Sequence, residues 1–210
     1  MLLGPKYVYK CPGCGKYIQK NSLLSGNNIG AALFSDGKSD APMLPEFPNI
    51  TKCKDCNTIL WLNKSNEVGT SDSEGRKPRK WQDAKQADFL TIDEYFEAIE
   101  KGLASNKDDE LFIRQRIWWS FNDRIRNGIN IFESDNDELR WKDNLHKLLD
   151  LLDISDMNHK ILSAEIYRSL GDFDKCINII ESIDKEQYGW LITKFVNECR
   201  TKNRWVVLLS

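Results

Sequence analysis

The sequence predicts an α+β protein in which short β-hairpins around a metal site precede an all-α region of helical hairpins. Two C-x-x-C motifs and five of the six prolines lie within residues 1–63. From residue 91 onward there is no proline, and apolar side chains recur with the period of an α-helix. We therefore expect a metal-binding domain over 1–63, a polar linker over 64–90 and a helical domain over 91–210.

The metal site is predicted from two motifs of the same form, Cys11-Pro12-Gly13-Cys14 and Cys53-Lys54-Asp55-Cys56. Two intervening residues let both sulfurs turn back onto one ion, and Gly13, Gly15 and Asn57 suit the tight, often left-handed backbone of such a turn. Zinc favours four sulfur ligands in a tetrahedron, and a closed site of this kind leaves no position for a catalytic water. We predict that one structural Zn2+ is bound by Cys11, Cys14, Cys53 and Cys56.

The arrangement of the two motifs is similar to that of zinc ribbons. The β-prone runs at 7–9 and 58–62 are expected as strands of short hairpins. Thirty-eight residues separate Cys14 from Cys53, so the gap must hold an excursion over 25–40 and 41–48. A redox dithiol and disulfides are the alternative uses of these thiols.

Six helices are expected after the linker. Thr91 is a suitable N-cap for the first, and Gly128 and Gly171 are suitable stops for the second and fourth. Apolar periodicity predicts helices over about 91–103, 108–126, 137–153, 157–170, 172–183 and 188–201. Residues 205–209 are expected as a further helical turn or as an extended tail.

One helix pair has the features of a known repeat. Within residues 160–183, Ala164 and Tyr167 match the small and aromatic positions of a first helix, and Gly171 and Phe173 match the turn. Cys176 stands where alanine is usual. This segment resembles one tetratricopeptide-type unit, and the resemblance implies protein or peptide binding on a concave face. An ordinary helical bundle is the alternative.

Composition narrows the choice of partner. The formal net charge of -2 gives no overall attraction to nucleic acid or to a membrane surface. No apolar run has the length of a signal peptide or of a membrane span, so a cytosolic protein is expected. Reduced thiols in that compartment favour metal binding over disulfides.

For the other candidate residues, a structural role is expected. Cys176 and Cys199 are expected in the helical core, and His146 and His159 at the surface. Trp118 and Trp119 point about 100° apart on a helix, so one is expected in the core and the other at its edge. The polar residues around them are expected on a solvated face with salt bridges: Arg114, Arg116, Asn122, Asp123, Arg124 and Arg126.

The expected function is protein–protein interaction without catalysis, as an adaptor, a regulator or a neutralising partner of another protein. The first alternative is a nucleic-acid-associated factor that uses the ribbon and a basic cluster at 76–81, in which Trp81 stacks on a base. The acids at 72, 74 and 83 dilute that cluster. A second alternative is an enzyme whose site forms only in the fold.

Overall fold

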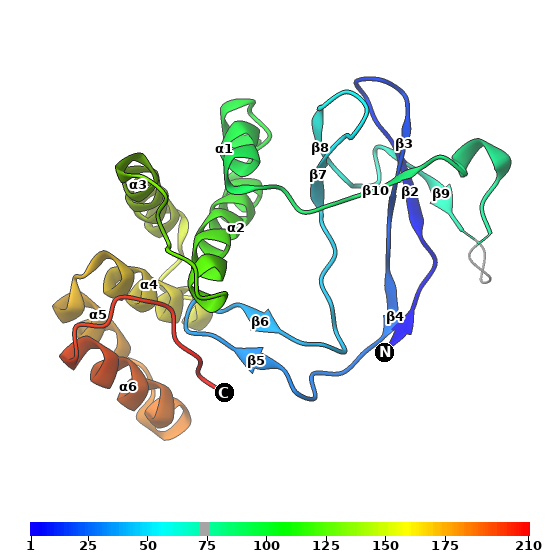
Figure 1. Ribbon diagram of the computed structural model, residues 1–210. Coiled ribbons are helices and arrows are strands. Elements are labelled where there is room, and N and C mark those ends of the chain that lie inside the picture. Colours follow the sequence, from blue (N-terminus) through cyan, green and yellow to red (C-terminus); the bar gives the residue numbers. More distant parts are fainter. Residues whose placement is uncertain (72–75) are drawn as a thin grey trace. The chain divides into compact units, whose positions relative to one another are not determined.

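The computed structural model describes residues 1–71 and 76–210, and it confirms the α+β class (Figure 1). Short strand pairs occupy the N-terminal half, and helices occupy the C-terminal part. The chain forms two compact units. Unit 1 comprises residues 1–31 and 41–103, and unit 2 comprises residues 32–40 and 104–210. The acids at 72 and 74 lie outside the described residues.

Unit 1 is built from small ladders that are antiparallel except for the parallel pairing of β10 with β3. Both runs that were expected as strands form hairpin strands, and each hairpin turns at a C-x-x-C motif. The larger sheet has the order β10-β3-β2-β9. Its strands are β2 (Tyr7–Lys10), β3 (Tyr17–Lys20), β9 (Glu67–Thr70) and β10 (Lys85–Gln86). The other pairs are β1 (Leu2–Leu3) with β4 (Leu23–Ser25), and β7 (Ile50–Lys52) with β8 (Ile59–Trp61).

The range expected as a polar linker contributes to this sheet. Besides β9 and β10 it contains a short 3-10 helix, η1 (Arg79–Trp81), whose Trp81 is buried with Val8 and Ala84. Gly69 of β9 has φ 144°, and the Trp81 ring occupies the space that a side chain would fill there. One buried tryptophan therefore holds a segment of polar composition against the strands.

Helix positions agree with the periodicity of the sequence. The helices are α1 (Ile92–Glu100), α2 (Lys107–Arg126), α3 (Asp135–Leu151), α4 (Met157–Leu170), α5 (Phe173–Ile180) and α6 (Lys185–Arg200). Thr91 forms a capping box with Glu94, and Gly171 ends α4 with φ 87°. Helix α1 belongs to unit 1, and the others belong to unit 2. Among the described residues, no helix is both long and apolar enough to cross a bilayer.

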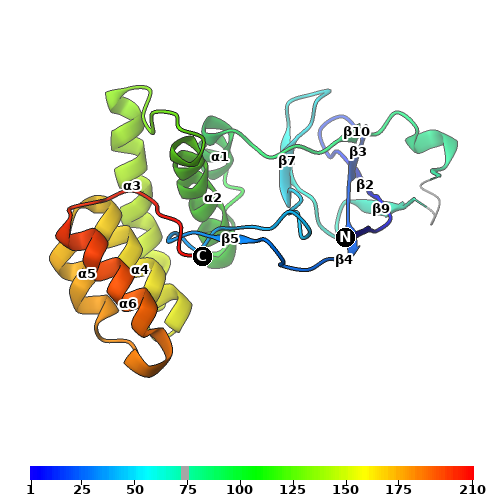
Figure 2. The same cartoon turned by 60° about the horizontal axis from the view of Figure 1, so that its bottom comes forward.

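Unit 2 packs its last three helices side by side, as two views show (Figures 1 and 2). Ala164 of α4 and Cys176 of α5 are both fully buried, so the small residue allows close approach as expected. The C-terminal tail is extended. Leu208 bridges to Phe34, and the rings of Trp141 and Trp205 lie 6.4 Å apart.

The excursion between the two motifs supplies a hairpin to unit 2. Strands β5 (Ala32–Leu33) and β6 (Ser39–Asp40) flank a turn that carries two fully buried polar residues, Ser35 and Asp36. Asp36 accepts a hydrogen bond from Asn122 Nδ2 at 2.7 Å and pairs with Arg126. Residues 32–40 thus pack with the helices although the chain on both sides belongs to unit 1.

These contacts correct one expectation. The polar residues around Trp118 do not form a solvated face, because Arg114 and Asn122 are buried at 5% and 3% exposure. Arg114 contacts Asn144 of α3, while Asn122 and Arg126 bind Asp36. The sequence pattern predicted that these polar side chains face solvent, because the buried groups that they contact are distant in the chain.

Candidate metal centre

The two C-x-x-C motifs form turns with the same backbone geometry. In the first, Gly15 N–H donates to Cys11 C=O at 2.9 Å, and Cys11 N–H donates to Lys16 C=O at 2.9 Å. In the second, Asn57 N–H donates to Cys53 C=O, and Cys53 N–H donates to Thr58 C=O, both at 2.8 Å. Gly15 and Asn57 have φ 74° and 61°. The left-handed backbone expected from the sequence is therefore confirmed at Gly15 and Asn57, whereas Gly13 does not have a positive φ.

The turns bring four sulfur atoms together. Cys11, Cys14, Cys53 and Cys56 have Sγ atoms that all lie within 4.8 Å of one another. The Cys11–Cys56 and Cys14–Cys53 pairs are 3.6 and 3.7 Å apart. A disulfide needs about 2.05 Å, whereas the edge of a tetrahedron with bonds of about 2.3 Å is about 3.8 Å. The arrangement is that of four ligands around one ion.

In each C-x-x-C motif the first cysteine is buried and the second is exposed. Cys11 and Cys53 are buried at 1% and 0% exposure, while Cys14 and Cys56 are exposed. Burial raises the pKa of the Cys11 thiol to about 12. The Thr58 hydroxyl lies 3.2 Å from Cys56 Sγ, and hydrogen bonding to Thr58 lowers the pKa of Cys56 to about 6. A metal ion must therefore displace the proton of Cys11, whereas Cys56 is already disposed to bind as a thiolate.

A short strap joins the two hairpins beside the cysteines. We use this name for residues 85–88. Its β10 pairs in parallel with β3 of the first hairpin. Toward the second hairpin, Lys85 pairs with Asp55, and Thr51 Oγ1 donates to Asp88 C=O at 2.8 Å. Sequence analysis missed the strap because a stretch of Lys, Gln, Ala and Asp has no strand-like alternation.

The remaining candidate residues lie elsewhere. Cys176 and Cys199 are buried in the core of unit 2, as expected. His146 is exposed, and His159 Nδ1 accepts a hydrogen bond from Asp153 N–H. Neither histidine joins a cluster of metal-binding side chains among the described residues.

The two tryptophans of α2 divide as expected. Trp118 is fully buried, and Trp119 Nε1 donates to Asp36 C=O at 3.0 Å. In the basic cluster, Trp81 is 6% exposed, so its ring is not presented to a base. Arg79 and Lys80 are exposed, while Lys77 Nζ donates to Gln19 Oε1 at 2.6 Å.

Comparison with known proteins gives no relative: no family model, curated protein or solved structure matches the chain.

Proposed function

We propose that the chain is a protein-binding module whose unit 1 is stabilised by one structural Zn2+. The zinc assignment is supported by a donor set of four sulfurs with tetrahedral spacing. A structural role is supported by the core of unit 1 around the site. Besides the two buried cysteines, the apolar cluster around the site contains Tyr9, Ile18, Leu60, Leu62 and Ala87. A metal ion whose ligands belong to such a cluster stabilises the fold around it.

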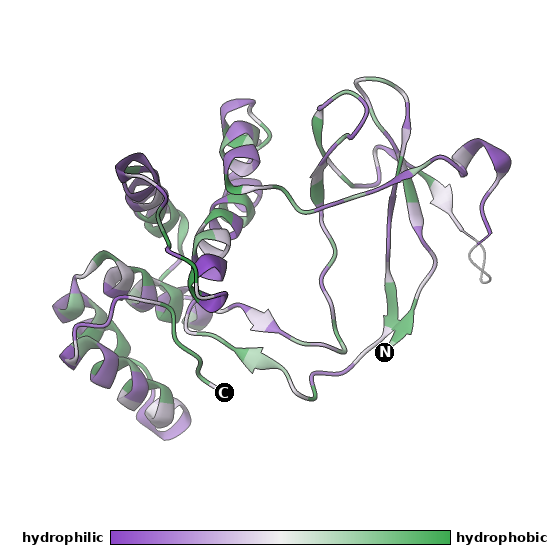
Figure 3. Ribbon diagram, in the orientation of Figure 1, coloured by the Kyte–Doolittle hydropathy of each residue, from purple (hydrophilic) through white to green (hydrophobic). Residues whose placement is uncertain are grey.

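The protein-binding role is supported by one exposed surface of unit 1, which we call the leucine patch. Its members lie on the β1–β4 ladder and on the turn at 43–44, which packs beside Leu23. Figure 3 shows both strands in the hydrophobic colour. They are Leu2, Leu3, Leu24, Met43 and Leu44, with exposures of 58%, 55%, 66%, 37% and 47%.

Contacts around Gly26 show how the two parts of the patch meet. A Cβ atom at Gly26 would lie 2.8 Å from Leu44 Cδ1 and 3.0 Å from Leu23 Cδ2. Side chains of the turn and of β4 thus border the same glycine. Exposed apolar side chains gathered at one ladder and its neighbouring turn are typical of a site that another protein covers.

Affinity capture from the source organism tests the proposal. The wild-type chain is compared with a patch variant, Leu24→Asp with Leu44→Asp, and with a matched control, Leu139→Asp with Ile154→Asp. The control residues are 66% and 73% exposed in unit 2. We expect a stoichiometric protein that survives nuclease treatment, is retained by the control and is lost from the patch variant.

Two outcomes would overturn the proposal. Equal retention by the patch variant would remove the leucine patch as the binding surface. Loss of all retained material after nuclease treatment would favour the nucleic-acid alternative, in which exposed Arg79 and Lys80 contact phosphate without base stacking.

A further inference from the structure

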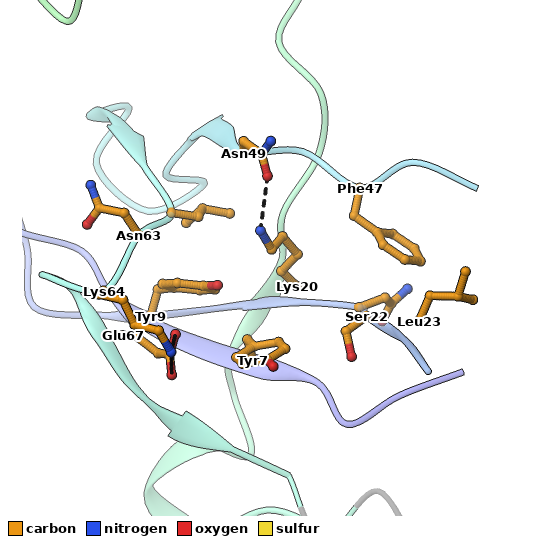
Figure 4. A pocket seen from close by; sticks show the side chains of 12 residues that line it. Tyr7, Tyr9, Lys20, Ser22, Leu23, Phe47, Asn49, Asn63, Lys64 and Glu67 are labelled. Carbon is orange, nitrogen blue, oxygen red and sulfur yellow. Dashed lines mark hydrogen bonds and ion pairs between the residues drawn. The ribbon is translucent and has the colours of Figure 1, made fainter. Parts of the chain in front are cut away.

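Unit 1 contains a groove that neither the metal centre nor the leucine patch uses (Figure 4). Its volume is about 580 Å³, within the range of small-molecule sites. Tyr7 and Tyr9 of β2 and Lys20 of β3 line it, together with Phe47 and Asn49 from the segment before β7. All of the lining residues belong to unit 1.

Within the part of the chain that the structure describes, one positive charge of the groove has no carboxylate partner. Lys20 and Lys64 are its cations and Glu67 is its carboxylate. Glu67 binds Lys64 through both oxygens, at 3.1 and 3.0 Å. Among the described residues, no carboxylate lies within ion-pairing distance of Lys20. Its Nζ donates to Asn49 Oδ1 at 3.3 Å and lies 5.7 Å from the centre of the Tyr9 ring.

The surroundings of Lys20 disfavour its charged form. Burial lowers the pKa of Lys20, and the carboxylate of Glu67 only partly opposes that shift. An anion placed beside Lys20 Nζ would restore the electrostatic stabilisation that water supplies elsewhere. Asn49 accepts from Lys20 through Oδ1, and its Nδ2 is a further hydrogen-bond donor in the lining of the groove.

The rest of the groove limits the kind of anion. Figure 4 places Phe47 and Leu23 at one end and the Lys64–Glu67 pair at the other, with Lys20 between them. The aromatic and aliphatic end suits an apolar body. A single unpaired lysine, with no arginine in the lining, matches one negative charge better than a doubly charged phosphate.

We infer that this groove binds a monocarboxylate with an apolar or aromatic body, with its carboxylate on Lys20 and Asn49 and its body against Phe47 and Leu23. The same chemical group occurs in a free organic acid and at the C-terminus of a peptide that ends in an apolar residue. The inference does not depend on the proposed protein-binding role.

The inference is tested by titrating ligands into the zinc-loaded full chain and following the binding in 1H–15N NMR spectra. The probes are 3-phenylpropionate and its neutral amide. A second pair, the peptide Gly-Leu-Phe with a free or amidated C-terminus, separates the two sources of the carboxylate. We expect the acid to shift the Asn49 side-chain amide signals and to bind about tenfold or more tightly than the amide. The peptide pair is expected to show the same preference if chain ends are accepted.

Lysine variants identify the residue responsible. Lys20→Met should remove the preference for the acid, whereas Lys20→Arg should keep most of it. Lys101→Met is the matched control, because Lys101 is an exposed lysine of unit 1 that pairs with Glu97 outside the groove. Equal binding of acid and amide by the wild-type chain would overturn the inference without any variant. Unchanged acid binding by a folded Lys20→Met chain would overturn it as well.

Discussion

The carboxylate of Asp36 and the guanidinium of Arg126, ninety residues apart in the chain, form an ion pair in unit 2. The side chain of Asp36 is completely buried, and that of Arg126 is 11% exposed. Asp36 also accepts from Asn122, and Arg126 also pairs with Asp123 at 2.7 Å. A residue from between the two cysteine motifs is thus part of the buried polar network of helix α2.

Removal of this carboxylate should destabilise unit 2. Asp36→Ala leaves Arg126 and Asn122 without their buried acceptor, and breaking such a pair costs about 3 kcal/mol or more. Denaturant unfolding followed by helical circular dichroism measures the change. Asp40→Ala is the control, because Asp40 is exposed on the same hairpin, and it should change stability by less than about 0.5 kcal/mol. Equal effects of the two substitutions would contradict the role of the pair.

The zinc content should depend on the four clustered cysteines and not on Cys176 or Cys199. We expect about one zinc per chain by elemental analysis. Serine at Cys11 or Cys53 should reduce the zinc content to near zero and unfold the hairpins of unit 1, because the site has no spare ligand. Cys176→Ser and Cys199→Ser should lower stability but keep the zinc, because both residues pack among apolar side chains of unit 2. Full zinc content in a Cys53→Ser chain would show that the cluster is not the site.

Alkaline stability should depend on Tyr9. Burial, followed by the nearby charge of Glu67, raises the pKa of Tyr9 to about 12 from the ordinary value of 10. The protonated phenol is favoured in the fold, so its contribution to stability is fully present below pH 10 and is lost as the pH rises toward 12. Unfolding measured at pH 9 and pH 11 should show a larger loss for the wild type than for Tyr9→Phe. Identical losses would mean that Tyr9 ionises as readily in the folded as in the unfolded chain.

The close approach of Trp81 to β9 should make Gly69 hard to replace. A Cβ atom at Gly69 would lie 2.5 Å from Trp81 Cη2, and the φ of 144° is itself unfavourable for other residues. Gly69→Ala should therefore destabilise unit 1 by about 2 kcal/mol or more. Gly102→Ala is the matched control: it has φ 74° but no atom within 4 Å, so only the backbone cost of about 1 kcal/mol applies. Thermal melting of the two variants compares them, and equal shifts would argue against the packing of Trp81 on β9.

Much of the local structure could be predicted from short-range patterns in the sequence. Apolar periodicity located the helices to within a few residues at their starts, and Gly171 ended α4 where expected. Two identical spacings identified the four cysteines that the structure brings together. Helical geometry also predicted that only one of Trp118 and Trp119 would be buried in the core, and the polar neighbours of His146 predicted its exposure. Each of these features depends on residues that are close in the sequence.

Long-range pairing was not predictable in the same way. Arg114 and Asn122 of α2 are buried because Asn144 and Asp36 lie opposite them, and neither partner has a periodic signal. Trp81 lies in a range that was expected as a polar linker, and its burial beside Gly69 depends on packing against strand β9. Polar composition alone does not distinguish a solvated segment from one that a single anchor holds.

The sequence by itself determined the cluster of possible metal ligands, the left-handed turns at Gly15 and Asn57, and the order of the helices, because spacing and backbone preference act over a few residues. Only the tertiary structure decided that residues 32–40 pack with the helices and that the strap joins the two hairpins. It also decided that Lys20 has no carboxylate partner among residues 1–71 and 76–210. These outcomes depend on contacts between groups that are distant in the sequence. Neither segment alone indicates how favourable such a contact is.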